Sequence, residues 1–205
     1  LLKKYFEEYN INYKYMHFPR TDSPIYGELI AKFLRGELGK MESVDPYLIA
    51  LIYAGDRNDT KSQINEWLKQ DYLVLIDRYV FSNIAFQCAK LNDNKEINKL
   101  SDWIKYLEYE YFKIPKPDIE IFLDVPSEFT KLNLSKNREG IDREYLQGKQ
   151  DIHEKNITFQ ERVREIYLNE VEKEDNFHKI ECYNENEKIY KPEAIKQRIL
   201  DYIKI

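Results

Sequence analysis

Cysteine is scarce in this sequence, and its two cysteines form no recognisable metal or redox pattern. Cys88 and Cys182 belong to no CxxC pair and to no cluster of cysteine and histidine. This usage excludes a small disulfide scaffold and fits a reducing compartment, so we expect a cytoplasmic protein whose cysteines are buried apolar residues. The three histidines, at positions 17, 153 and 178, are too scattered to suggest a zinc site.

Long apolar runs and an excess of positive charge are also absent. The longest apolar run covers the eight residues 47–54, whereas a membrane helix needs about 20. With 32 Lys and Arg against 37 Asp and Glu, the formal charge is −5, which argues against a dedicated nucleic-acid binder. A hydrophobic content of 42% is too high for a disordered chain. We expect a soluble protein with a single domain over residues 1–205 that involves no nucleic acid and no membrane.

Short apolar segments alternate with segments of helical periodicity along the whole chain. Strands are expected at residues 13–18, 72–76, 119–125 and 178–183. Helices are expected at residues 24–35, 46–59, 60–69, 82–91, 97–112, 126–137, 154–173 and 192–203. The first two follow the capping pairs Ser23–Pro24 and Asp45–Pro46. This alternation predicts an α/β fold in which a parallel sheet is covered by helices on both faces.

Residues 138–153 (REGIDREYLQGKQDIH) differ from the rest of the chain. They contain two glycines, charges of both signs and almost no periodic apolar face. This composition predicts a surface loop between two helices, either a simple solvated connection or a mobile segment with a function.

Arginine is informative because it is scarce, with nine arginines among 32 basic residues. Its planar fork binds carboxylate or phosphate in a bidentate way that lysine cannot reproduce. Arg20 and Arg78 directly follow expected strands, where open α/β sheets bind their ligands. Asp77 precedes Arg78 at the end of a strand and is placed to meet a magnesium ion, although a structural Asp–Arg ion pair explains the same spacing.

Tyr53 and Arg57 form a second candidate group. They stand at positions i and i+4 of an expected helix and therefore share one face. An aromatic ring beside a guanidinium suits a planar heterocycle, whereas a core tyrosine with a surface arginine is the structural alternative.

Five motifs in a fixed order resemble those of the thymidylate kinase family and span nearly the whole chain. They are FPR at residues 18–20, LIYAGDRND at 51–59, DRYVFSNIAFQ at 77–87, PKPDIEIFLDVP at 115–126 and RxxxxRxxxxxxxDIHE at 138–154. The resemblance implies a three-layer P-loop nucleotide kinase-like fold, with a parallel sheet of about five strands, four of them in this chain. It also implies transfer of the γ-phosphoryl group of ATP to deoxythymidine monophosphate (dTMP), giving dTDP for dTTP synthesis, with Mg²⁺ as cofactor and a homodimer as the assembly.

The resemblance assigns residues to the dTMP site. Tyr53 takes the place of a phenylalanine that stacks on thymine, and His153 stands where the family has a tyrosine next to the deoxyribose. The full set implied around the base, the sugar and the acceptor phosphate is Phe18, Arg20, Tyr53, Arg57, Arg78, Asn83, Phe86, His153 and Glu154.

The resemblance also implies the catalytic residues Asp77, Arg78 and Arg143. Asp77 would lie near Mg²⁺, directly or through water, and Arg78 would bind the acceptor phosphate. Residues 138–153 would form a lid in which Arg138, Arg143 and Lys149 face the ATP phosphates, with Arg143 as the expected catalytic arginine.

The largest departure from the family pattern is the absence of a GxxxxGK[ST] string, which cradles the ATP phosphates in such kinases. We expect that a strand and this loop precede Leu1 in the natural product, and that the chain without them is inactive. Two other functions stay open. A deoxynucleoside kinase shares the fold, although Arg20 and Arg78 argue for an acceptor that already carries phosphate. A non-catalytic nucleotide-binding pseudo-kinase is consistent with the missing loop.

Overall fold

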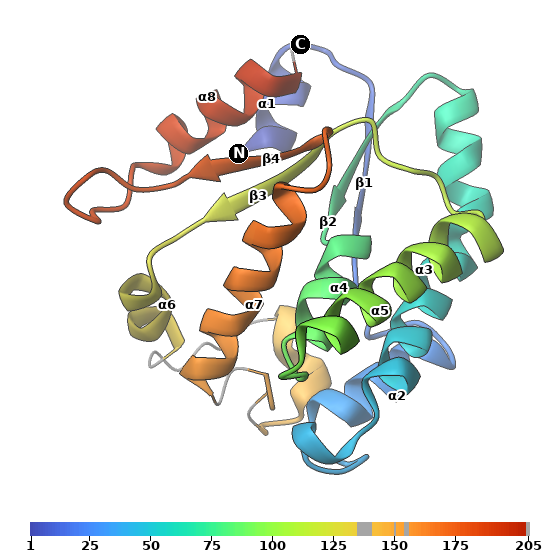
Figure 1. Cartoon of the computed structure of the whole chain (residues 1–205). Helices are drawn as coiled ribbons and strands as arrows, with labels where there is room; N and C mark the ends of the chain where they lie inside the picture. Colours follow the sequence, from blue (N-terminus) through green and yellow to red (C-terminus); the bar gives the residue numbers. More distant parts are fainter. Residues whose placement is uncertain (135–140, 150, 154–155, 204–205) are drawn as a thin grey trace.

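Four strands form the centre of the fold (Figure 1). The computed structural model describes residues 1–134, 141–149, 151–153 and 156–203. β1 (Tyr13–His17) pairs with β2 (Leu73–Asp77), and β3 (Glu120–Asp124) pairs with β4 (Phe177–Glu181), both in parallel. Each strand lies where the sequence predicts one, which confirms the α/β prediction.

The strands form two separate ladders rather than one continuous sheet. Within the part of the chain that the structure describes, no strand joins β2 to β3 through backbone hydrogen bonds. The two pairs nevertheless share one hydrophobic core. Met16 of β1 and Phe177 of β4 belong to the same cluster of buried side chains as Ile84 and Phe159. Side-chain packing therefore connects the two halves of the fold.

Helices cover both faces of the strands, as the alternation predicts. On one face lie α1 (Leu2–Glu8) and α8 (Pro192–Ile203), which appear together near both chain ends in Figure 1. The other face carries α3 (Pro46–Lys69), α5 (Asn94–Lys105) and α7 (Ile157–Val171), which all pack against α4 (Val80–Cys88). Within the described residues, no helix is long and apolar enough to cross a membrane.

The helix α3 is one continuous element, whereas the sequence predicts a break near residue 60. No glycine or proline interrupts it there, and the Thr60 hydroxyl donates to the Arg57 carbonyl oxygen within the helix. Asp45 caps its start as predicted, because its carboxylate accepts from the backbone N–H groups of Tyr47 and Leu48. The helix thereby carries residues 53–57 in one rigid segment.

The helix α2 (Tyr26–Leu34) begins later than the Ser23–Pro24 pair predicts. Ile25 adopts a φ of 63°, which prevents the helix from starting before Tyr26. The Ser23 hydroxyl still accepts a hydrogen bond from the Gly27 backbone N–H, but it also bonds to Asp56 of α3. The serine therefore connects two helices in addition to supporting one.

Several short elements complete the chain. These are the 3₁₀ helix Met41–Ser43, the π-helical turn Tyr106–Tyr111 that continues α5, α6 (Ser127–Leu134) and the 3₁₀ helix Ile141–Leu146. The last of these lies within the predicted surface loop. Leu146 and His153 in that loop are buried, whereas residues 147–149 are exposed, so the loop is packed against the fold in part and solvated in part.

Candidate active site

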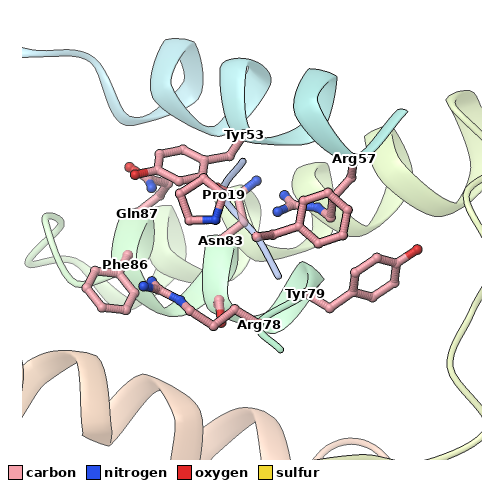
Figure 2. Close-up of a pocket in the computed structure, with 10 residues that line it drawn as sticks. Pro19, Tyr53, Arg57, Arg78, Tyr79, Asn83, Phe86 and Gln87 are labelled. Carbon is pink, nitrogen blue, oxygen red and sulfur yellow. The ribbon is translucent and has the colours of Figure 1, made fainter. Parts of the chain in front are cut away.

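A pocket opens between α3 and α4, beyond the carboxyl ends of β1 and β2 (Figure 2). Figure 2 shows the Tyr53 ring and the Arg57 side chain extending from α3 toward α4, as the i, i+4 spacing predicts. The residues that line it are Phe18, Pro19, Tyr53, Arg57, Arg78, Tyr79, Ser82, Asn83, Phe86 and Gln87. The fold therefore brings together six predicted site residues that are distant in sequence: Phe18, Tyr53, Arg57, Arg78, Asn83 and Phe86.

Arg57 is held at the pocket by a buried carboxylate. Its Nε and Nη2 atoms donate to Glu108 at 2.5 and 2.6 Å, and the two side chains are 2% and 0% exposed. Burial alone would lower the pKa of the Arg57 guanidinium, but the neighbouring Glu108 carboxylate outweighs it, and the pKa is raised. Arg57 is thus a permanently charged donor with N–H groups left over.

The Asn83 side chain has one defined orientation. Its Nδ2 atom donates to the Ala50 carbonyl oxygen and to Glu108 Oε1, both at 3.0 Å. Because both neighbours can only accept, the amide nitrogen must face them. Asn83 Oδ1 is consequently buried without a hydrogen-bond partner among the described residues. Among the residues that line the pocket, Asn83 therefore carries a buried acceptor without a partner among the described residues, and Arg57 carries a fixed donor.

Arg78 is the second arginine of the pocket. Its backbone φ is 66°, a left-handed conformation that costs a residue other than glycine about 1 kcal/mol or more. Its guanidinium carbon lies 4.8 Å from the centre of the Phe86 ring, and no carboxylate among the described residues forms an ion pair with it. A strained backbone thus holds, at the end of β2, a cation without an ion-pair partner among the described residues, which suits an anionic ligand.

Arg20 lies beside the pocket but does not line it. Its backbone N–H and its Nε atom donate to the Asp56 carboxylate at 2.9 and 3.0 Å, and its Nη2 atom donates to the Asp56 carbonyl oxygen. The side chain is 26% exposed, so part of the guanidinium still reaches solvent.

Asp77 is the last residue of β2 and directly precedes Arg78. Its Oδ2 atom lies 3.2 Å from His17 Nδ1 and accepts from the Tyr15 hydroxyl at 3.3 Å. The contact with His17 lowers the pKa of Asp77, which keeps the carboxylate ionised at neutral pH. The described residues contain no group of three or more potential metal ligands. A single carboxylate nevertheless fits Mg²⁺, which retains water and takes its other oxygens from phosphates.

The predicted lid residues fall partly inside the described chain. Arg138 and Glu154 lie outside it, and for Arg143 the structure describes the backbone only, in the 3₁₀ helix Ile141–Leu146. Lys149 pairs with Glu37 at 2.8 Å. His153 packs among the rings of aromatic residues on three helices and does not line the pocket: Phe33, Phe86 and Phe159.

Burial determines the state of His153. It lowers the pKa of the imidazole well below its usual value, with smaller contributions from Lys90 and Arg78, so the ring is neutral. Its Nε2 atom has no hydrogen-bond partner among the described residues.

Sequence reasoning missed the carboxylates that hold the arginines. Asp56 adjoins Arg57 in the LIYAGDRND motif, so its position next to a candidate residue was the available signal. Glu108 lies in a helix rich in acidic and aromatic residues, and nothing in the sequence distinguishes it from its neighbours. Tyr79, directly before α4, and Ser82 and Gln87 on α4 also line the pocket, and each is adjacent in sequence to a predicted residue.

Parallel strands with an aromatic, arginine-bearing pocket at their carboxyl ends define an α/β nucleotide-binding protein. The chain belongs to the thymidylate kinase family, which it matches over residues 1–191.

Individual relatives are consistent with this membership. Over 150 residues the chain is 29% identical to the thymidylate kinase of Mycobacterium tuberculosis (strain H37Rv), a match that covers 73% of this chain and 67% of that protein. Over 128 residues it is 33% identical to a probable thymidylate kinase of Pyrobaculum aerophilum, covering 62% of this chain and 55% of that protein. The solved structure of the Candida albicans thymidylate kinase shares the fold, with a TM-score of 0.64, 18% identity and coverage of 99% and 86%.

Proposed function

We propose that this protein is an ATP-dependent kinase that phosphorylates dTMP to dTDP, with the pocket between α3 and α4 as the acceptor site. Membership of the thymidylate kinase family supports the reaction and ATP as the donor. The observation that supports the choice of acceptor is that two pocket-lining side chains combine a fixed donor, Arg57, with a buried acceptor that has no partner among the described residues, Asn83 Oδ1.

The thymine edge matches this pair. Thymine has an N3–H donor between two carbonyl acceptors, whereas cytosine has an acceptor at N3 and an amino group at position 4. Asn83 Oδ1 would accept from N3–H, and a free N–H of Arg57 would donate to an adjacent carbonyl. The Tyr53 ring, which comes from the same helix as Arg57, would stack on the base.

Arg78 would bind the acceptor phosphate, because it is charged, faces the pocket and has no ion-pair partner among the described residues. Arg20 would assist from the edge of the pocket with the part of its guanidinium that Asp56 leaves free. An acceptor that already carries phosphate suits these two arginines better than a nucleoside.

Mg²⁺ would be held by Asp77 and by phosphate oxygens of the substrates, and when bound it would neutralise charge that develops during phosphoryl transfer. Residues 138–153 would act as a lid, with Arg138, Arg143 and Lys149 toward the ATP phosphates, and Glu154 and His153 on the sugar side. The protein would work as a homodimer, as its family resemblance implies, and in the cytoplasm, as its cysteine usage indicates.

The direct test is a coupled assay of ADP release by the complete gene product. We expect ATP turnover with dTMP and little or none with dCMP, because cytosine lacks the N3–H donor that would satisfy Asn83. Equal rates with dTMP and dCMP, or ADP release with GMP alone, would contradict the proposal.

A further inference from the structure

Glu108 contacts both side chains that would read the base, although it does not line the pocket itself. One carboxylate oxygen accepts from Arg57 Nε at 2.5 Å, and the other accepts from Arg57 Nη2 at 2.6 Å and from Asn83 Nδ2 at 3.0 Å. Arg57 comes from α3 and Asn83 from α4, so this carboxylate joins the two walls of the pocket from behind.

The backbone around Glu108 has an unusual form. Glu108 lies in the π-helical turn Tyr106–Tyr111, which widens the end of α5. The Phe112 backbone N–H donates to the Leu107 carbonyl oxygen and the Ile114 N–H to the Glu108 carbonyl oxygen, which closes this wider turn. Such turns are rare and occur often at functional sites. The carboxylate is fully buried, so its hydrogen bonds have no competition from water.

We infer that Glu108 is the positioning residue that sets base specificity, because it forces Asn83 to present an acceptor and Arg57 to present a donor to the ligand. This inference rests on the proposed function and names the determinant of its selectivity. A carboxylate can only accept hydrogen bonds, so Glu108, together with the Ala50 carbonyl oxygen, excludes the flipped Asn83 amide, whose oxygen would face both acceptors. The flipped amide is the one that would accept cytosine, since it would offer N–H to the N3 lone pair.

A glutamine at position 108 would weaken this constraint while keeping the shape of the side chain, and the Ala50 carbonyl oxygen alone would then favour the original orientation. It offers one acceptor oxygen and one donor NH₂ group where the carboxylate offers two acceptors. If the NH₂ group takes the place of Oε1, which bonds to both Arg57 Nη2 and Asn83 Nδ2, the Asn83 amide meets a donor there and can turn its oxygen toward position 108 in exchange for its bond to the Ala50 carbonyl oxygen. The pocket would then present a donor where thymine also has a donor.

The test is calorimetric titration of the unmodified chain and of Glu108→Gln with dTMP and with dCMP. We expect the ratio of the two dissociation constants, dCMP over dTMP, to fall about tenfold in Glu108→Gln, the effect of one neutral hydrogen bond. Glu170→Gln is the matched control, because Glu170 is 2% exposed and bonds to Lys105 and Lys173 away from the pocket. Its ratio should equal that of the unmodified chain.

A loss of affinity that is equal for dTMP and dCMP would overturn the inference, because it would show a structural role without selectivity. Failure of the unmodified chain to bind dTMP would overturn the proposed function, and the inference with it.

A measurement on the unmodified chain covers the case in which Glu108→Gln does not fold. Hydrogen exchange of the two Asn83 side-chain amide protons, followed by NMR, should be at least about tenfold slower than that of an exposed asparagine, since both protons are hydrogen-bonded. Exchange at the exposed rate would show that the amide is not fixed, and would overturn the inference.

Discussion

Asp56, which is fully buried, accepts hydrogen bonds from both the backbone N–H and the guanidinium of Arg20. The next residue along α3, Arg57, points to a different partner, Glu108. Asp56 thus connects α3 to the loop after β1. Arg57, the next residue of the same helix, connects α3 to the end of α5. Arg20 and Arg57 are each positioned by a buried acid, whereas Arg78 has no ion-pair partner among the described residues.

Removal of Asp56 should destabilise the protein and weaken ligand binding. Asp56→Ala leaves the Arg20 guanidinium without its main partner, and we expect the free energy of unfolding to fall by about 3 kcal/mol. Asp59→Ala is the control, because Asp59 is 46% exposed and 3.9 Å from Arg20, so the expected change is less than about 1 kcal/mol. Urea unfolding of the two variants makes the comparison. Similar losses in both would mean that Asp56 does not hold Arg20.

Stability should depend on pH through Glu120. Both of its carboxylate oxygens are buried without a hydrogen-bond partner among the described residues. Burial, with a smaller contribution from Glu174, raises its pKa from 4.5 to about 8. Between these two pH values the folded state retains a proton that the unfolded state releases. The free energy of unfolding should therefore fall as pH rises through this range.

Glu120→Gln mimics the protonated acid at every pH. We expect the variant to match the unmodified chain near the lower end of the range and to be about 2–4 kcal/mol more stable above its upper end. The exposed Glu165→Gln change on α7 should show no such pH dependence. Chemical unfolding of the variant and of the unmodified chain at pH 5 and at pH 8.5 measures the difference between their free energies of unfolding. A constant difference between the two pH values would show that Glu120 does not titrate as described.

Arg143 should act on turnover rather than on affinity. In the complete gene product, Arg143→Ala should lower kcat by about 10³-fold or more while the KM values for ATP and dTMP change little. Arg162→Ala is the control, since Arg162 bonds to Asn92 on the surface. Steady-state kinetics at saturating ATP and dTMP separates the cases. A loss found with Arg138→Ala instead would transfer the role to that residue, and no loss in either would exclude the lid arginines from catalysis.

The 205-residue chain should bind dTMP without forming ADP. It contains the acceptor pocket but no GxxxxGK[ST] string to cradle the ATP phosphates. Incubation with ATP, dTMP and Mg²⁺, followed by chromatography of the nucleotides, should show no dTDP. Formation of dTDP by the pure chain would mean that other residues hold the donor phosphates.

Local signals made much of the fold predictable. The four strands are short apolar segments, and the Asp45–Pro46 pair starts α3 because both its side-chain cap and its proline act within a few residues. The predicted start of α2 was wrong, because the positive φ of Ile25 is set by the surrounding fold. The pairing of β2 with β1 and of β3 with β4 could not be read from any single segment, since it depends on contacts between segments far apart in the chain.

The site was predictable where residues project from known ends of strands or share a helix face. Tyr53, Arg57 and Arg78 meet at one pocket for those reasons. Glu108 was not predictable, because it follows Arg57 by 51 positions and its role depends on a π-helical turn that propensity does not encode. The packing of the His153 ring among phenylalanines was not predictable either, because it depends on how the loop folds back on α2 and α7.

The central proposal is a pocket built for a nucleoside monophosphate, and it is tested most directly by calorimetric titration of the chain with dTMP and with thymidine. The two ligands share the base and sugar and differ only in the phosphate that Arg78 would bind. A charged hydrogen bond of about 1.5–3 kcal/mol predicts that dTMP binds about 10- to 100-fold more tightly than thymidine. Thymidine binding as tightly as dTMP would contradict the assignment and favour a kinase that acts on the nucleoside.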